Sequence, residues 1–162
     1  MRIGVFSDVH DDIQNLKVAL SKFESGGIRT LIFCGDFCSP VPAKIMSQYN
    51  GRIHCVFGNG DGDRFAIAKI AEKSSSLQLY GEHGELELNG IKLAVTHYPL
   101  YGQALARTGD YQAVFSGHTH KVHQQRFEDC LWLNPGDIMG LHGRATCAIF
   151  DLKTLIAEIV YL

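Results

Sequence analysis

Short apolar segments alternate with amphipathic ones along the first half of this chain. Residues 3–6, 31–34 and 53–57 are rich in β-branched and aromatic side chains, which predicts three buried strands. Between the first two strands, apolar residues recur at spacings of three and four, which predicts a helix with one buried face. That face contains Ile13, Leu16, Leu20 and Phe23.

Two further helices are predicted in the same half. The Ser-Pro-Val-Pro segment at 39–42 favours the start of a helix with Ile45 and Tyr49 facing inward. A third helix is expected around residues 65–71. Either Asp11 or Asp12 is suited to cap the N-terminus of the first helix.

The second half is richer in predicted strands. Asn89-Gly90 is typical of a two-residue hairpin turn and separates strands expected at 85–88 and 91–96. A short helix is expected near 103–107. Further strands are predicted at 113–116, 123–127, 131–134, 146–151 and 155–161. Repeated βα units followed by a strand-rich half predict a one-domain α/β fold, residues 1–162, in which two packed sheets carry helices on their outer faces.

The overall charge limits the partners of such a fold. Lys and Arg number 15 against 17 Asp and Glu, giving a net charge of -2. This offers no basic stripe for a nucleic acid and no polybasic anchor for a membrane. No apolar run approaches the roughly 20 residues that cross a bilayer, and charge follows the first residue too closely for a signal peptide.

The cysteines indicate a reducing environment. There are five, with no Cys-x-x-Cys pair, and several lie within predicted strands: Cys34, Cys38, Cys55, Cys130 and Cys147. We therefore expect reduced core residues in a cytoplasmic protein, without a thiolate zinc site. Whether an exposed hydrophobic strand pairs two copies into a homo-oligomer stays open at this stage.

Polar residues follow the ends of five predicted strands. Because loops converge at the carboxyl ends of strands in α/β sheets, these side chains are expected to meet at one edge. Residues spaced i, i+2 in extended backbone face the same side, and two such pairs occur in the set. The set comprises Asp8, His10, Asp36, Asn59, His97, His118 and His120.

Two carboxylates, one amide and four imidazoles favour borderline or hard divalent ions. Seven donors exceed the needs of one tetrahedral zinc, so two ions that share a bridging carboxylate are expected. Manganese is the first choice, with iron, nickel, zinc and magnesium as alternatives. Taken singly, each motif also has an ordinary structural interpretation, such as a helix cap for Asp8, a hydrogen-bonded structural histidine for His97, or a turn at Asn59. The prediction rests on their combination.

The chain resembles the calcineurin-like metallophosphoesterase superfamily in an ordered set of short segments covering nearly its whole length. Its opening is similar to that of small single-domain bacterial and archaeal phosphodiesterases. The segments are Asp8-Val-His10, Gly35-Asp36, Gly58-Asn59-Gly-Asp61, Thr96-His97, Gly117-His118-Thr-His120 and Asn134-Pro135-Gly136.

The resemblance implies a four-layer α/β/β/α sandwich of two mixed sheets flanked by helices. It also implies two metal sites that share Asp36. One would be held by Asp8, His10, Asp36 and His120, and the other by Asp36, Asn59, His97 and His118.

Two positions depart from the family pattern. Many members have a histidine after the asparagine, implicated in protonating the leaving group, where this chain has Gly60. Tyr98 follows His97 in place of a smaller or polar residue, where it would either contact substrate or be a rim residue without a role. We expect Asp36, Asn59 and His97 to be catalytic, and Asn59 and Tyr98 to bind substrate.

These observations predict a metal-dependent phosphoesterase acting on small-molecule phosphoesters, foremost a phosphodiesterase in which a metal-bridging hydroxide attacks phosphorus. Without a histidine at position 60, activated aryl diesters should react better than alkyl monoesters, because general acid catalysis is typically worth about 10²–10⁴-fold. Asp61, Asp63 and His142 are candidate replacement acids, and Asp11, Asp61 and Asp137 are candidates to orient the ligand histidines.

Two rival functions are weighed against the enzyme. One is a protein-binding scaffold on the same fold, similar to the retromer subunit, with little or no catalysis. The other is a nucleotide-binding domain, which the absence of a glycine-rich phosphate loop after the first strand disfavours. Metal-dependent turnover of an aryl diester would separate the enzyme from the scaffold.

Overall fold

The computed structural model describes residues 1–162 as two mixed sheets and four helices. The first sheet has the strand order β11-β10-β1-β2-β3-β4. Its strands are β1 Arg2–Phe6, β2 Thr30–Phe33, β3 Arg52–Cys55, β4 Leu77–Leu79, β10 Thr146–Asp151 and β11 Ile156–Tyr161.

The second sheet has the order β5-β6-β7-β9-β8. Its strands are β5 His83–Leu88, β6 Ile91–Thr96, β7 Ala113–Phe115, β8 Val122–Phe127 and β9 Cys130–Pro135. The helices are α1 Ile13–Ser25, α2 Pro40–Met46, α3 Arg64–Lys73 and α4 Pro99–Ala106.

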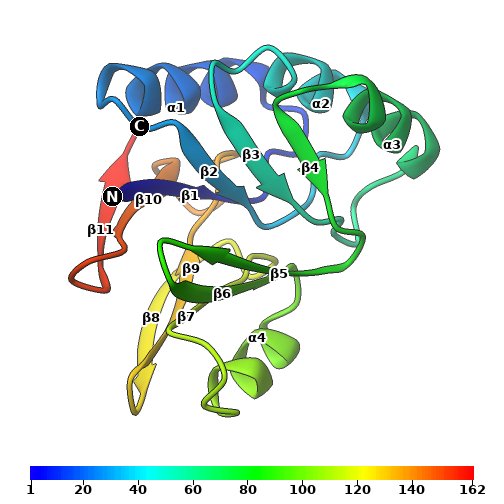
Figure 1. Cartoon of the computed structure of the whole chain (residues 1–162). Helices are drawn as coiled ribbons and strands as arrows, with labels where there is room; N and C mark the ends of the chain where they lie inside the picture. The colour runs from blue at the N-terminus through cyan, green and yellow to red at the C-terminus, as the bar shows by residue number, and fades with distance from the viewer.

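The helices cover the outer faces of the sandwich. In Figure 1, α1, α2 and α3 lie above the first sheet, and α4 lies below the second. One buried cluster joins the three upper helices to the first sheet, and a smaller one joins α4 to the second. A third fills the space between the sheets. The four-layer α/β/β/α architecture expected from the sequence is therefore confirmed.

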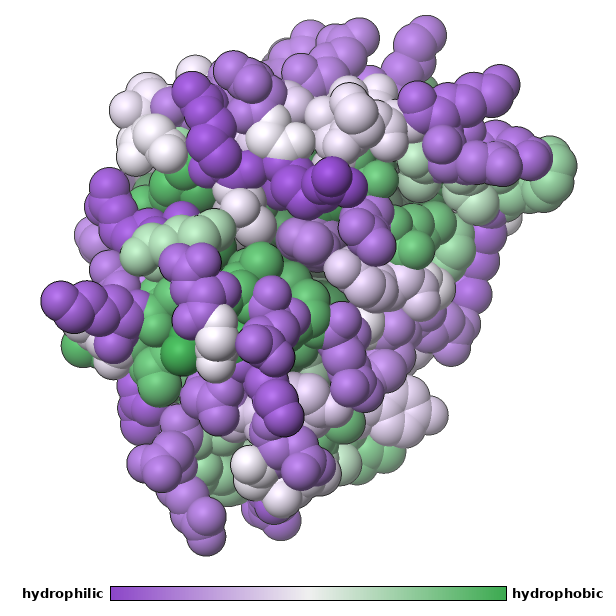
Figure 2. All heavy atoms as spheres, in the orientation of Figure 1, coloured by the Kyte–Doolittle hydropathy of each residue, from purple (hydrophilic) through white to green (hydrophobic).

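The surface reflects this layering. In the orientation of Figure 1, hydrophilic side chains predominate over the helical layer at the top, and hydrophobic ones gather at mid-height on the left (Figure 2). The cluster between the sheets is fringed by partly buried apolar residues from both of them, including Leu86, Ile91 and Ile159. The long apolar faces of the two sheets thus stabilise each other at the centre of the molecule.

Parallel pairing aligns the strands that lead into the polar loops. In the first sheet β1, β2 and β3 are parallel neighbours, and in the second β6, β7 and β9 are. Their carboxyl ends consequently reach a common edge, where the two sheets bring their loops together.

The boundaries show where local patterns mislead. Helix α4 begins at Pro99, four residues before its expected start, because proline suits the first turn of a helix. Strand β4 was not predicted: its three residues are too short for a periodic signal, and pairing with β3 defines it. Tyr49 is buried as expected, but it lies beyond the end of α2, and its hydroxyl donates to the carbonyl of Ile28 at 2.6 Å. The cap of α1 is Asp12, which accepts from the amide of Asn15.

Candidate metal centre

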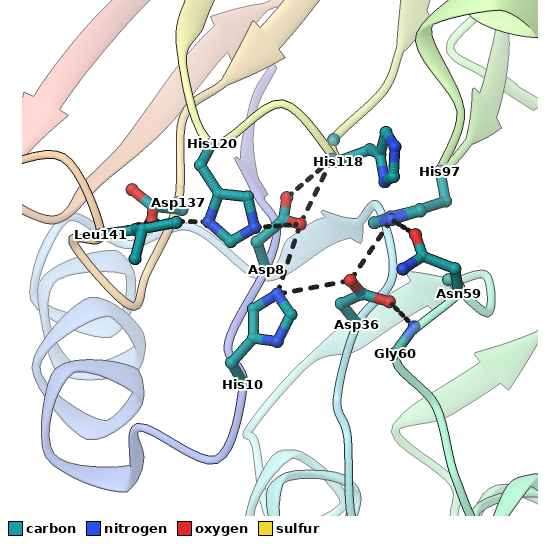
Figure 3. A network of polar contacts seen from close by, with 12 residues as sticks. Asp8, His10, Asp36, Asn59, Gly60, His97, His118, His120, Asp137 and Leu141 are labelled. Atoms are coloured by element: carbon teal, nitrogen blue, oxygen red, sulfur yellow. Dashed lines mark hydrogen bonds and ion pairs between the residues drawn. The ribbon is translucent and has the colours of Figure 1, made fainter.

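Five loops bring the predicted polar residues to one place (Figure 3). The loops following β1, β2 and β3 come from the first sheet, and those following β6 and β7 from the second. All seven residues lie in these loops, although 112 positions separate Asp8 from His120 in the sequence. The predicted convergence at the strand ends is therefore observed.

Asp36 lies between the two histidine-bearing halves of this cluster. Its Oδ2 atom is 3.3 Å from Nε2 of His10 and 3.4 Å from Nε2 of His97. The Asp36 side chain is almost completely buried. Its other oxygen, Oδ1, accepts a hydrogen bond from the backbone amide of Gly60 at 2.7 Å, which fixes the carboxylate in this position.

Asp8 joins the same cluster from the first strand. Its Oδ1 atom is 3.5 Å from Nε2 of His120 and 3.7 Å from Nε2 of His10. Ligand atoms of Asp8, His10 and His120 lie mutually close enough to hold one ion, and those of Asp8, Asp36 and His97 do so for another. Asp8 thus approaches both positions, whereas the resemblance assigned it to one.

Asn59 and His118 lie at the more exposed side of the cluster. Oδ1 of Asn59 is 3.0 Å from Nε2 of His97. The His118 ring centroid is 5.1 Å from that of His97, and the His118 backbone amide donates to Asp8 Oδ2 at 3.0 Å. The His118 side chain is not a member of either tight group of carboxylate and imidazole atoms, whereas Oδ1 of Asn59 contacts one of them through His97.

Five of the seven residues have left-handed backbone conformations. The φ angles are 55° for Asp8, 43° for His10, 65° for Asp36, 73° for His118 and 57° for His120. Such angles are uncommon outside glycine and cluster at functional sites, where surrounding structure enforces them. The extended backbone that we assumed for the two i, i+2 pairs is therefore wrong: sharp turns, not strand geometry, aim these side chains at a common point.

Two glycines allow the loops to approach the carboxylates closely. A Cβ atom on Gly58 would lie 2.1 Å from Oδ1 of Asp36, and one on Gly117 would lie 2.6 Å from Oδ2 of Asp8. Neither glycine has a positive φ. Their role is to leave room beside the carboxylates rather than to permit a turn.

Two candidate ligand histidines are oriented through their Nδ1 atoms. Nδ1 of His120 is 2.8 Å from Oδ2 of Asp137, and Nδ1 of His97 is 2.8 Å from the carbonyl oxygen of Cys34. Both contacts point Nε2 toward the carboxylates, the usual arrangement for metal-binding histidines. Asp137 was anticipated in this role, whereas no sequence signal marks a backbone carbonyl such as that of Cys34.

The third such contact involves a thiol. Sγ of Cys38 is 3.1 Å from Nδ1 of His10. Cys38 is half-buried and has a φ of 72°, so its loop is turned sharply toward His10. We had interpreted this cysteine only as a core residue; the sequence contained the residue type but nothing that placed it beside His10.

The other two anticipated orienting carboxylates bind elsewhere. Asp61 accepts from the backbone amides of Gly58 and Cys38 at 2.8 and 2.9 Å and so connects two loops. Burial raises the pKa of Asp61, and these hydrogen bonds oppose the shift. Asp11 accepts from the hydroxyl of Ser39 at 2.6 Å, beside the start of α2. Neither contacts a candidate ligand histidine.

Close packing of imidazole and carboxylate shifts the pKa values of both. Burial opposes the charge on Asp36, but hydrogen bonding to His97 and the nearby imidazoles lower its pKa overall. Burial likewise disfavours protonation of His97, yet Asp36 and Asp8 raise its pKa. For His10, contact with Asp8 raises the pKa against the opposing effect of burial. The cluster is an environment that stabilises positive charge.

The donor set fits divalent metal ions. Two ligand atoms that bind the same ion at about 2.1 Å lie roughly 3 to 3.5 Å apart. This matches the nitrogen–oxygen separations around Asp36. Nε2 of His10 is buried without a hydrogen-bond partner. A buried imidazole nitrogen aimed at two carboxylates without such a partner is suited to coordination.

A side chain at position 60 would be crowded by the carboxylate of Asp36. A Cβ atom there would meet the carboxylate of Asp36 at 3.1–3.2 Å, and the Gly60 amide already donates to that carboxylate. A side chain at position 60 would thus require a small shift of the Asp36 carboxylate. Asp63, one candidate acid, instead caps α3 by accepting from the amide of Ala66 at 2.9 Å.

Comparison with known proteins shows the family to which the chain belongs. The model of the calcineurin-like phosphoesterase superfamily domain matches residues 1–155. The chain therefore belongs to the calcineurin-like phosphoesterase superfamily, as its ordered segments had indicated.

One named relative and several solved structures are similar to this chain. Phosphodiesterase MJ0936 of Methanocaldococcus jannaschii is 30% identical over 156 residues, covering 94% of each chain. A solved structure described as a novel archaeal phosphodiesterase is also 30% identical, with a TM-score of 0.89 and complete coverage of both chains. A Vps29 variant from Entamoeba histolytica superposes with a TM-score of 0.70 over 100% of this chain and 99% of its own. At 18% identity, that last likeness shows the fold alone.

Proposed function

We propose that this protein is a phosphodiesterase that binds two divalent ions at the strand-end cluster and hydrolyses small phosphodiesters. The observation that carries the proposal is the position of Asp36, with one oxygen 3.3 and 3.4 Å from the imidazoles of His10 and His97. The similarity to proteins named as phosphodiesterases supports the choice of reaction. The residues proposed to bind metal are Asp8, His10, Asp36, Asn59, His97, His118 and His120.

The buried and the exposed residues of the site would have different roles. When bound, the ions would activate water near neutral pH and neutralise charge on the phosphoryl oxygens. The buried Asp8, Asp36 and His97 form the rigid floor of the site. Asn59, at the exposed side, is suited to donate from its amide nitrogen to a phosphoryl oxygen, because its Oδ1 faces His97.

Tyr98 forms an aromatic rim beside this floor. Its ring centroid is 5.3 Å from that of His97 and 5.7 Å from that of His118. Tyr101 packs edge-on against Tyr98 at 5.7 Å and is 57% exposed. We infer that the organic group of the substrate packs here, since exposed aromatic surface beside a polar site suits a planar ligand group.

Leaving-group dependence tests the reaction. Since Gly60 cannot donate a proton, bis(4-nitrophenyl) phosphate should be hydrolysed faster than alkyl monoesters such as glycerol phosphate by about 10²-fold or more. Equal rates for aryl diesters and for monoesters of high leaving-group pKa would contradict the proposal. Absence of turnover with every metal would favour the scaffold function on the same fold.

Metal reconstitution tests the cofactor. We propose two ions per chain, with manganese as the preferred metal, because the oxygen and imidazole donors lack a thiolate. Stripped protein should be reconstituted separately with manganese, iron, nickel, zinc and magnesium and analysed for bound metal and for activity. Elemental analysis near one ion per chain at full activity would contradict the shared role of Asp36.

Two further properties belong with this proposal. All five cysteines are free thiols, which suits the reducing cytoplasm proposed as its location. None of the helices has the length and apolar character needed to cross a bilayer.

A further inference from the structure

A hollow of about 260 Å³ adjoins the proposed active site at His120. His120 and Asp137 form the wall that it shares with the site, and Val122 begins the strand on its other flank. Its volume suits a small substituent rather than a whole ligand. The side chains that line its open part are Lys121, His142, Arg144, Thr146 and Tyr161.

The net charge of the side chains that line this hollow is positive, opposite in sign to the net charge of the chain. The chain as a whole has a net charge of -2, yet the hollow is lined by two cations and a single carboxylate, Asp137. Asp137 is buried and already accepts from Nδ1 of His120 and from the amide of Leu141, both at 2.8 Å. The Asp137 carboxylate therefore already has hydrogen-bond partners in the wall of the metal centre and in the loop that follows Asp137.

The two cations have no partner among the acidic side chains. None of the ion pairs in the structure involves Lys121 or Arg144. The guanidinium carbon of Arg144 lies 5.1 Å from the centre of the Tyr161 ring, and Nη2 is 3.4 Å from the main-chain oxygen of Leu162, the last residue of the sequence. These contacts hold Arg144 in place while leaving most of its donors free.

The hollow borders the proposed metal centre at His120. The His142 and His120 rings are 6.4 Å apart and nearly perpendicular. The loop that carries His142 and Arg144 is tied to the site at its start, because the amide of Met139 donates to the carbonyl of Asp8 at 3.1 Å. A substrate whose phosphodiester lies at the metal centre would therefore reach the hollow with its adjacent substituent.

We propose that this hollow is an anion subsite, and that the substrates of the enzyme are phosphodiesters carrying a second anionic group, a carboxylate or a phosphate, beside the scissile bond. This rests on the proposed phosphodiesterase function. Arg144 would bind the second anion through its guanidinium fork, and Lys121 would add a point charge at the rim.

A matched pair of ligands tests the subsite by binding, independently of turnover. Diphenyl phosphate and phenyl 4-carboxyphenyl phosphate differ by one carboxylate, and their affinities can be measured by calorimetry on metal-loaded protein. We expect the wild-type chain to bind the carboxylated compound about fivefold more tightly or better, the factor that a partly exposed ion pair provides. The preference should shrink in 0.5 M salt, where such interactions are screened over about 4 Å.

Charge-neutral variants assign the effect to the hollow. Combining Lys121→Gln with Arg144→Gln should bring the ratio of the two affinities close to one. The control combines Lys17→Gln with Lys153→Gln, two exposed cations elsewhere, one on α1 and one between β10 and β11; it makes the same change in net charge and should keep the ratio. Equal wild-type affinities for the two ligands, or a preference that survives in the Lys121/Arg144 variant, would overturn the proposal.

Kinetics separate this inference from the proposed function. With 4-nitrophenyl as leaving group in both members of an analogous pair, the preference should appear in KM and disappear in the double variant. If the wild-type chain hydrolyses neither compound with any metal, the phosphodiesterase proposal fails while the binding experiment still decides whether the hollow holds an anion. Turnover of both compounds with equal KM would instead reject the subsite and leave the phosphodiesterase standing.

Discussion

The two sheets contribute different chemistry to the candidate site. The loops of the first sheet supply both carboxylates, the amide and one imidazole, from Asp8, Asp36, Asn59 and His10. The loops of the second supply imidazoles only, from His97, His118 and His120. Negative charge therefore comes from one half of the sandwich, and most of the imidazole donors come from the other.

The two halves are also fixed in different ways. Asp36 is held by a backbone amide of its own sheet, that of Gly60. His97, from the second sheet, is oriented by the carbonyl of Cys34 in the first, and the His118 amide donates to Asp8. Contacts across the sheet interface thus complete the site, so the geometry of the metal centre depends on the packing of the two sheets.

The largest expected effect comes from removing the group shared by both halves. Asp36→Asn should lower kcat/KM for bis(4-nitrophenyl) phosphate by about a thousandfold, because a metal ion contributes several kcal/mol to charge stabilisation. Metal content should fall in parallel. The control is Asp63→Asn, which retains a good cap on α3. An Asp36→Asn enzyme with more than a tenth of the activity and two ions per chain would break the comparison.

A smaller effect is expected from Asp137, which supports a histidine of the second sheet. Asp137→Asn should weaken metal binding by about 10- to 100-fold, because the carboxylate holds the His120 ring and increases its basicity. Competition with a chromophoric chelator measures this change. Asp110→Asn, at an exposed position, is the matched control. Unchanged metal affinity would mean that the contact between His120 and Asp137 does not contribute to metal binding.

The thiol beside His10 should matter less than the carboxylate beside His120. Cys38→Ala is expected to reduce metal affinity only about two- to fivefold, because sulfur is a weak hydrogen-bond partner. Cys38→Ser, which restores a partner at similar distance, should recover part of the loss. A deficit in Cys38→Ala as large as that in Asp137→Asn would show that the two halves rely equally on their supports.

A histidine outside the metal centre should affect the stability of the fold and not the activity. His54, on β3, is nearly buried, and its Nδ1 lies 2.8 Å from the Tyr80 hydroxyl. Burial, followed by the nearby charge of Arg52, lowers the pKa of His54 from 6.5 to about 4. Between these values the unfolded chain binds the extra proton and the folded chain does not, so this contribution to stability is present above pH 6.5 and is lost as pH falls.

The measurement compares urea unfolding of wild-type and His54→Gln protein from pH 7.5 to 4.5 in chelator. The stability advantage of the wild type over the variant should shrink by about 1 kcal/mol per pH unit below about pH 6. Titration of the other histidines is common to both proteins and cancels. An advantage independent of pH would show that His54 is not neutral in the folded state.

Much of the fold could be predicted from local patterns. The strands preceding Asp8, Asp36 and Asn59, the stripe of α1 and the hairpin at Asn89-Gly90 each carry a strong short-range signal, and all are present. Strand β4 could not be placed in this way, because pairing with β3 defines it. The start of α4 at Pro99 did carry a local signal, the proline, which the predicted bounds did not use.

The sequence alone determined which chemical groups this protein places after its strands, because strand ends and residue types are local properties. Only the tertiary structure decided how those groups meet: the left-handed turns at Asp8 and Asp36, the carbonyl of Cys34 on His97, and the thiol of Cys38 on His10. Each of these depends on segments distant in the chain. Their positions follow from the packing of two whole sheets, which no short stretch of sequence contains.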